Sequence, residues 1–230
     1  MTSQDKAWQT EDLDLLKNST LFNSLDNRQI SELAEQFKPA SFQRGEIIFT
    51  RGGPGDALYL IKSGRVKVSI TNQDGNELII TIYSRGEIFG EMSLFDGLPR
   101  SADATALEAV EALQLSRANF EELLLKLPQL SSSIIAMLSR RLRYTTTELE
   151  MIGLLDAYER VAYKLLQLAE SGEQTGTITI KLSQQELASM LGLTRVWLNK
   201  VLNYFVEQGV IQVDRGKITL LDIQALRKWL

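Results

Sequence analysis

Hydrophobic positions change their spacing twice along the chain, and each change predicts a different kind of structure. Residues 13–16 and 28–37 show the three-to-four spacing of short amphipathic helices. From residue 41 the spacing becomes two, and Asp74-Gly75 is a strong tight-turn signal. Segments rich in Ile, Val, Tyr and Thr predict strands at residues 46–50, 57–62, 65–71, 77–83, 103–107 and 109–116. Such short, regularly spaced strands predict a barrel or jelly roll.

The second half of the chain returns to helical spacing. A short helix is predicted at residues 117–127, and a longer one at 129–155 would span about 40 Å at 1.5 Å per residue. Apolar positions on the longer helix repeat at intervals of three and four residues, which is typical of a coiled-coil seam. The seam consists of Ile135, Leu138, Leu142, Thr145, Leu149 and Ile152. We expect this helix to pair with its copy in a homodimer; the alternative is packing on its own β-roll.

Residues after the long helix predict a winged helix-turn-helix. Asp156 is a candidate N-cap for a helix at residues 158–171, and Ser183 and Glu186 form a capping-box pattern before a second helix. Gly192 closes that helix, Thr194 caps a third at 195–208, and residues 210–214 and 217–221 predict a hairpin wing. On the third helix the predicted buried stripe is Leu198, Val201, Leu202, Phe205 and Val206.

These elements predict an α+β fold in three parts. Residues 1–128 hold the N-terminal helices and a jelly-roll-like β-roll, and residues 129–156 form the dimerisation helix and hinge. Residues 157–230 form the winged helix-turn-helix.

Composition excludes several function classes. The 230 residues include no cysteine and no histidine, which excludes disulfides, a thiol nucleophile, a Ser-His-Asp triad and the usual zinc, haem or iron–sulfur ligand sets. No combination of base, nucleophile and metal ligands is evident. We therefore expect no catalytic residues and no bound metal, and we expect that the protein is not an enzyme. No run reaches the roughly 18 apolar residues of a membrane span, and residues 1–12 lack a signal-peptide pattern. We expect a cytoplasmic protein without a membrane partner.

Charge is distributed unevenly along the chain. Residues 1–156 hold 16 basic and 22 acidic side chains, a net charge of −6, whereas residues 157–230 hold 9 and 7, a net charge of +2. A basic C-terminal part beside an acidic body is consistent with contact to nucleic acid through the C-terminal part.

Residues 89–102, Phe-Gly-Glu-Met-Ser-Leu-Phe-Asp-Gly-Leu-Pro-Arg-Ser-Ala, combine groups that suit a sugar phosphate. Gly90 permits close backbone approach, and the carboxylate of Glu91 can accept from a ribose hydroxyl. The next residues, including Met92 and Ser93, can form one helical turn with free N–H groups. Arg100 presents a planar fork that matches a phosphate, and Ser101 can add a neutral hydrogen bond. The alternative is a surface loop whose Glu and Arg pair with each other or with solvent.

This segment resembles the phosphate-binding cassette of cyclic-nucleotide-binding domains, in which Gly-Glu, a small helix and Pro-Arg-Ser/Thr/Ala-Ala follow in order. The resemblance implies that Glu91 binds the ribose 2′-hydroxyl and that Arg100 binds the cyclic phosphate. With the helix-turn-helix it extends over roughly residues 15–220. It indicates the cyclic AMP receptor and fumarate-nitrate reductase regulator (CRP/FNR) family of bacterial transcription regulators.

Two threonines on the predicted long helix help to identify the ligand. In the cyclic AMP receptor branch of the family, two neighbouring hydroxyl residues of this helix contact the adenine, one from each subunit. Alignment on Arg140-Arg141-Leu142 and Leu155-Asp156 places Thr145 and Thr146 at those positions. The resemblance therefore implies cyclic AMP as the allosteric ligand, with cyclic GMP as the nearest rival. The alternative is a threonine pair tolerated at a wet coiled-coil position.

The exposed face of the predicted third helix carries the candidate DNA contacts. Such a motif lays the residues near the N-terminus of this helix on base edges in the major groove of double-stranded DNA. The candidates are Thr194, Arg195, Val196, Asn199, Lys200 and Asn203, with Arg215 and Lys217 from the wing. Arg195 suits guanine, whereas Lys200 and the wing residues suit phosphates.

The recognition helix departs from the family pattern. The cyclic AMP receptor commonly has Arg-Glu-x-x-x-Arg where this chain has Arg195-Val196-x-x-x-Lys200. Val196 lacks the acceptor for cytosine N4 and can instead contact a thymine methyl. We therefore expect a palindromic operator with half-sites one helical turn apart and altered inner bases.

The resulting hypothesis is a dimeric, cyclic-AMP-responsive regulator that also contacts RNA polymerase. One alternative is a DNA-binding relative that needs no effector, or that senses cyclic GMP, cyclic di-GMP or a dicarboxylate. The other is a regulatory subunit that binds a cyclic nucleotide and controls a partner protein.

Overall fold

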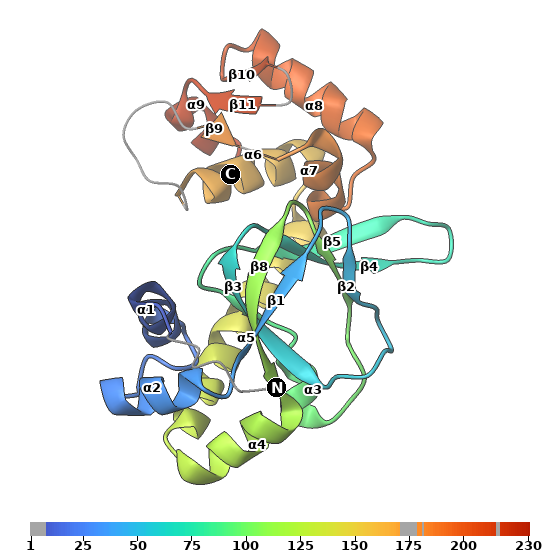
Figure 1. Cartoon of the computed structure of the whole chain (residues 1–230). Coiled ribbons are helices and arrows are strands. Elements are labelled where there is room, and N and C mark those ends of the chain that lie inside the picture. Colours follow the sequence, from blue (N-terminus) through green and yellow to red (C-terminus); the bar gives the residue numbers. More distant parts are fainter. Residues whose placement is uncertain (1–7, 171–178, 181, 215–216) are drawn as a thin grey trace. The chain divides into compact units, whose positions relative to one another are not determined.

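The computed structural model describes residues 8–170, 179–180, 182–214 and 217–230. The chain divides into two compact units, Met1–Ile70 with Ile80–Arg141, and Thr71–Ile79 with Leu142–Leu230. The long helix α5, Leu130–Leu154, passes through both. A β-roll, a long helix and a C-terminal winged helix-turn-helix confirm the predicted α+β fold (Figure 1). Among the described residues, none of the helices is both long and apolar enough to cross a membrane.

Eight strands form the two four-stranded sheets of the roll, in the orders β1-β8-β3-β6 and β2-β7-β4-β5. Their bounds are β1 Lys38–Phe42, β2 Ile47–Phe49, β3 Ala57–Ser63, β4 Val66–Thr71, β5 Glu77–Tyr83, β6 Ile88–Phe89, β7 Asp103–Ala106 and β8 Val110–Ser116. The turn between β4 and β5 has Gly75 at φ 81°, and its backbone N–H donates to Asn72 at 3.1 Å. The turn signal at Asp74-Gly75 is thereby confirmed.

Helices lie along one sheet of the roll (Figure 1), and their buried apolar side chains pack against that sheet. They are α1 Thr10–Asn18, α2 Asn27–Ala34, α4 Arg117–Lys126 and the first part of α5. Buried members of this layer include Leu16, Phe22 and Phe120 from the helices and Leu58 and Leu115 from the strands. Between the two sheets, a second cluster centres on Tyr59, Phe89 and small alanines such as Ala104. These two cores hold the loop from β6 to β7 in place.

The second unit contains the winged helix-turn-helix. Its elements are α6 Ala157–Glu170, β9 Thr179–Ile180, α7 Gln184–Leu191, α8 Arg195–Glu207, β10 Ile211–Asp214, β11 Lys217–Leu220 and α9 Ile223–Arg227. The predicted caps are confirmed: Ser183 and Glu186 form a capping box, Gly192 ends α7 in the left-handed region, and the Thr194 hydroxyl accepts from the N–H of Trp197. Local sequence signals thus fix where both helices begin.

A buried lysine joins α5 to α6 within this unit. The side chain of Lys164 is fully buried, and its ammonium donates to both carboxylate oxygens of Glu148, at 2.9 and 2.8 Å, and to Gln167 at 2.7 Å. Arg160 donates to the carbonyls of Ile152 and Leu155 at the end of α5. Since cations favour helix C-termini, the contacts of Arg160 stabilise the end of α5. The buried pair of Lys164 and Glu148 fixes the position of α6 on α5, because breaking it would leave an uncompensated buried charge.

The structure also corrects the prediction at several elements. Strand β1 was missed because Lys-Pro-Ala-Ser-Phe has no β-branched residue, yet an edge strand tolerates proline, and Pro39 lies opposite Leu113. Strand β6 and helix α9 were missed because they have only 2 and 5 residues. Val206 was wrongly predicted to be buried: it is 41% exposed, since it lies beside the stripe of Leu198, Val201, Leu202 and Phe205.

Candidate functional site

The cassette is a tight backbone loop between β6 and β7. After Phe89 the chain turns at Gly90 (φ 78°), forms the one-turn helix α3, Met92–Asp96, and ends it at Gly97 (φ 72°). A Cβ on Gly90 would lie 2.9 Å from Nη1 of Arg100 and 3.2 Å from the ring of Phe49. Glycine is therefore required there both for its positive φ and for the close approach of Arg100.

Arg100 is buried, with 4% of its surface exposed. Its Nη1 donates to the carbonyl of Gly90 at 2.5 Å and its Nη2 to the carbonyl of Ala57 at 2.7 Å. The guanidinium carbon lies 4.1 Å from the centre of the Phe49 ring. Burial lowers the pKa of Arg100 from its ordinary value. Its Nε is buried without a partner, so one N–H donor remains open.

Glu91 is fully buried, and Arg141 from α5 contacts it. Nη1 of Arg141 donates to Oε1 of Glu91, and Nη2 donates to the carbonyl of Ile88 at 2.5 Å. Burial raises the pKa of Glu91 above its ordinary 4.5, whereas Arg141 opposes that shift. The second oxygen, Oε2, has no partner, so one acceptor remains open.

An aromatic cluster supports both cations. Phe89 stacks on Tyr59 at 5.1 Å and lies near Phe49 and Tyr83 at 6.0 and 6.3 Å between ring centres. Arg100 lies over Phe49, and Arg141 lies 5.1 Å from the centre of the Tyr83 ring. Burial raises the pKa of Tyr83 to about 12, so its hydroxyl stays protonated beside Glu91.

These groups line a cavity of about 50 Å³ within the first unit. Its lining residues are Phe49, Val68, Tyr83, Gly90, Glu91, Met92, Ser93, Arg100, Ser101, Ala102 and Arg141. The structure thus brings together all six cassette residues predicted from sequence. Ser101 is exposed and its hydroxyl lies 3.8 Å from the sulfur of Met92. Glu91 and Arg100 are buried and bond to other groups, which excludes the alternative of a solvated surface loop.

Sequence reasoning missed Arg141, Tyr83 and Phe49 as part of this cavity. Arg141 lies 50 residues after Glu91, so no local pattern links the two. The sequence signal that could have identified Arg141 was the pair Arg140-Arg141 on the predicted long helix. That helix was interpreted only through its apolar seam and its two threonines. Thr145 and Thr146 belong to the second unit and are exposed, and the Thr146 hydroxyl donates to the carbonyl of Leu142 at 2.9 Å.

The predicted seam on α5 is largely open to solvent. The exposed fractions are 65% for Ile135, 38% for Leu138, 70% for Leu142 and 69% for Leu149. Thr145 is exposed as well, and Ile152 is partly buried. A row of exposed leucine and isoleucine side chains at heptad spacing is unusual for a monomer surface and suits pairing with another helix.

The exposed face of α8 contains the predicted DNA-contacting residues. Thr194, Arg195, Val196, Lys200 and Asn203 are exposed, Asn199 is partly so, and Lys217 on β11 is exposed. Arg215 lies outside the described residues. Val196 is 79% exposed, and Nζ of Lys200 lies 4.6 Å from the centre of the Trp197 ring. The first two turns of α8 thus present two cations, Arg195 and Lys200, beside the exposed apolar side chains of Val196 and Trp197.

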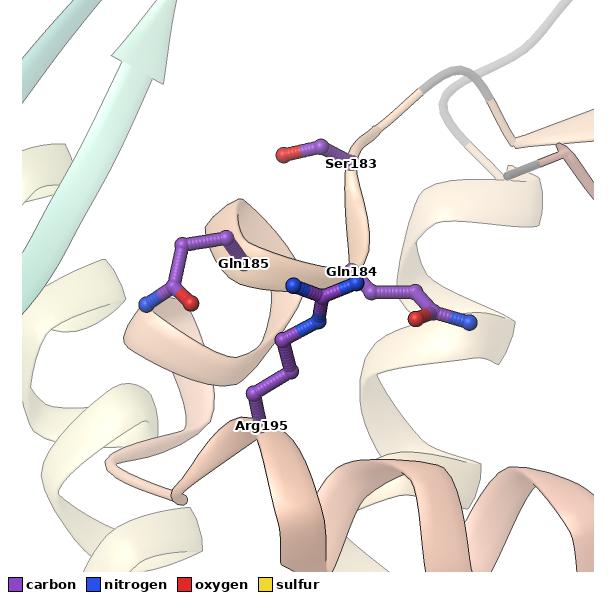
Figure 2. Close-up of a pocket in the computed structure, with 4 residues that line it drawn as sticks. All are labelled: Ser183, Gln184, Gln185 and Arg195. Atoms are coloured by element: carbon purple, nitrogen blue, oxygen red, sulfur yellow. The ribbon is translucent and has the colours of Figure 1, made fainter. Parts of the chain in front are cut away.

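A second pocket, of about 340 Å³, lies where α7 and α8 begin. Ser183, Gln184, Gln185 and Arg195 line it. Figure 2 shows the guanidinium of Arg195 reaching from the start of α8 toward Gln184, while the side chains of Gln184 and Gln185 extend to opposite sides. Helix N-termini and an arginine together favour an anion. Ser183, the N-cap of α7, and the first two residues of α7, Gln184 and Gln185, were not predicted as DNA contacts.

No group of three or more acidic, histidine or cysteine side chains in the described part of the chain is arranged to hold a metal ion. The open groups in the cavity are instead a carboxylate oxygen and a guanidinium N–H. Their chemistry suits an organic ligand with a hydroxyl donor and an anionic acceptor.

Comparison with known proteins gives two domain families. Residues 39–126 match the cyclic nucleotide-binding domain, and residues 159–229 match the Crp-like helix-turn-helix domain.

Among curated proteins, the chain is 34% identical over 219 residues to the CRP-like cAMP-activated global transcriptional regulator of Mycobacterium tuberculosis, covering 94% of this chain and 98% of that protein.

Two solved structures are also similar. A CRP/FNR-family transcriptional regulator from Thermus thermophilus has a TM-score of 0.70 and 29% identity, over 84% of this chain and 97% of that one. The c-di-GMP responsive global regulator CLP of Xanthomonas campestris has a TM-score of 0.76 and 24% identity, over 85% and 99%, which shows the shared fold.

Replacing Arg141 with glutamine is expected to lower the free energy of unfolding near neutral pH by about 3 kcal/mol, because it leaves a buried carboxylate without its cation. The change also raises the pKa of Glu91 further above 4.5. Between 4.5 and that raised pKa, the folded variant keeps a proton that the unfolded chain has lost, so stability falls as pH rises through this window.

Urea unfolding between about pH 5 and pH 8 checks this expectation. The deficit of R141Q relative to the unmodified protein should be smallest at the acidic end and grow with pH. The double variant E91Q/R141Q is the control and should lack this pH-dependent part. A deficit that is equal at every pH would contradict the role assigned to the ion pair.

Proposed function

The chain belongs to the CRP/FNR family of transcription regulators, and from that premise we propose that it is a homodimeric regulator controlled by cyclic AMP. It is a DNA-binding transcription regulator that carries a cyclic nucleotide-binding domain. The proposal adds three points: cyclic AMP is the ligand, the protein is a homodimer, and named residues contact the ligand, the second protomer and the DNA. It also places the domain boundaries at residues 1–128, 129–156 and 157–230, and it includes no enzymatic activity.

One observation carries the ligand proposal: a buried acceptor and a buried donor are left without partners on two residues that line the same cavity. Oε2 of Glu91 suits a ribose hydroxyl, and Nε of Arg100 suits an oxygen of a cyclic phosphate. Ser93 and Ser101 add hydroxyls at the same cavity. The name of the mycobacterial relative supports cyclic AMP, with Thr145 and Thr146 as the proposed adenine contacts.

In this mechanism, the ligand acts by differential affinity for two states of the dimer. Arg100 neutralises the cyclic phosphate, and Glu91 orients the ribose. Binding then favours the state in which both recognition helices fit successive major grooves. The shift is bounded by the ratio of the ligand's affinities for the two states.

Replacing Arg100 with leucine is expected to weaken cyclic AMP binding by at least about 100-fold, because the charged contact to the phosphate is lost. The same change leaves the carbonyls of Gly90 and Ala57 without a donor, so some stability is lost too. R100K is the matched variant: it keeps a cation for those carbonyls but has no Nε–H, and should bind at least about tenfold more weakly than the unmodified protein.

Calorimetric titration of each variant with cyclic AMP, cyclic GMP and cyclic di-GMP provides the measurement. Unchanged cyclic AMP affinity in folded R100L and R100K would reject the assigned site. If the unmodified protein binds cyclic di-GMP more tightly than cyclic AMP, cyclic di-GMP would replace cyclic AMP as the proposed ligand. If saturating ligand failed to promote binding to any DNA pool, control of a partner protein would be favoured instead.

The exposed seam on α5 supports the homodimer. We expect Leu142→Glu to raise the dimer dissociation constant by at least about 100-fold, because it places a charge in an apolar helix interface. Sedimentation equilibrium measures this. Leu125→Glu is the control, since Leu125 is 85% exposed on α4 and off the seam. Equal dimerisation of L142E and L125E would show that the protomers do not meet along this helix.

The same proposal makes Val196 a determinant of the operator sequence. Selection from random double-stranded DNA with ligand present is expected to return a palindrome with half-sites one helical turn apart, about 34 Å. A thymine is expected where the common family half-site places the cytosine contacted by glutamate. V196E should restore selection of that cytosine. Recovery of the same half-site by both proteins would contradict this role.

A further inference from the structure

Arg117 lies outside the cavity but its side chain reaches the cassette. It is the first residue of α4, directly after β8, and its backbone N–H donates to the carbonyl of Asp56 at 2.7 Å. About a third of its side chain, 32%, is exposed. It does not line the cavity, and sequence analysis gave it no role.

The guanidinium of Arg117 is bound mainly by backbone carbonyls. Nη2 donates to Gly55 and to Ser93, both at 2.6 Å, and Nη1 donates to Leu94 at 3.4 Å. The carboxylate of Glu121 is farther away, at 3.9 Å, and largely exposed. One nitrogen therefore joins two backbone segments, the loop before β3 and helix α3. Hydrogen bonds from a charged donor are stronger than neutral ones.

These two segments pack against each other without room for adjustment. A Cβ on Gly55 would lie 2.0 Å from Cβ of Ser93, so the backbone of Gly55 is in direct contact with α3. Two residues after Gly55, the carbonyl of Ala57 holds Arg100. Two residues before Ser93 lies Glu91. The bridge made by Arg117 thus joins the segment that holds Arg100 to the segment that carries Glu91.

We propose that Arg117 is a positioning residue for ligand binding: it fixes α3 against the start of β3 and so sets the separation of Glu91 and Arg100. This inference rests on the proposed cyclic nucleotide site. A ligand that joins a ribose hydroxyl to a cyclic phosphate has a fixed distance between them. Affinity therefore depends on how firmly the two protein groups are held apart before binding.

The test compares R117Q and R117K with the unmodified full-length protein, using Arg28→Gln as the charge-matched control. Arg28 has a side chain that is 88% exposed and pairs with Glu32 on α2. Three measurements are made on each protein: calorimetric titration with cyclic AMP, urea unfolding without ligand, and amide hydrogen exchange of residues 91–95 without ligand.

R117Q is expected to raise the dissociation constant for cyclic AMP at least about tenfold. Exchange in residues 91–95 should accelerate, whereas exchange in the strands of the roll should stay unchanged. R117K keeps the charge but not the planar fork, so its affinity for cyclic AMP should lie between that of the unmodified protein and that of R117Q. R28Q should match the unmodified protein. A purely structural role would lower the unfolding midpoint without this selective change at the cassette.

Wild-type affinity in folded R117Q would overturn the proposal; if R117Q does not fold, wild-type affinity in R117K would do so. Failure of the unmodified protein to bind cyclic AMP would reject the proposed ligand instead. In that case the ligand-free exchange decides the inference, because unchanged protection of residues 91–95 in R117Q would show that Arg117 does not order the cassette.

Discussion

Burial of two opposite charges at one end of the β-roll is the constraint on which the candidate site depends. Removing Glu91 and Arg100 from water is unfavourable unless their hydrogen-bonding groups find partners. Two carbonyls and the face of Phe49 compensate Arg100, and Arg141 compensates Glu91. Each residue nevertheless keeps one open atom. Because the compensation is incomplete for both residues, the groups left without partners suit a ligand that supplies a hydroxyl and an anion.

The interior of the roll explains how one cavity can contain two guanidinium groups. Arg100 and Arg141 lie over Phe49 and Tyr83, two rings of one aromatic cluster, so each cation faces a negative π surface. Burial raises the pKa of Tyr83 to about 12, so the cluster adds no second negative charge beside Glu91 near neutral pH. Small residues such as Ala104 and Gly90 leave the room that the large rings and the arginines occupy.

Sequence alone predicted those features that are encoded within a few residues. The cassette loop, the capping box and the glycine that ends α7 all follow from local patterns, and the structure places them where those patterns lie. The apolar spacing of α5 likewise leaves a row of exposed side chains. Contacts between distant segments were not predictable. Arg141 meets Glu91, and Arg117 meets Gly55 and Ser93, only because the roll folds back on itself. Val206 was predicted wrongly, because periodicity gives the direction of a buried stripe better than its width.

Helix α5 has a buried ion pair at each of two positions about two turns apart. Arg141 contacts Glu91 in the first unit, and Glu148 contacts the buried Lys164 of α6 in the second. Neither pair is a solvated surface contact, since Glu91 and Lys164 have essentially no exposed side chain. A helix held in this way resists independent movement at either position, because breaking a buried pair costs far more than breaking an exposed one. Any change in how Arg141 is held therefore perturbs one of these two buried pairs, and the oxygen left without a partner, Oε2 of Glu91, belongs to that same pair.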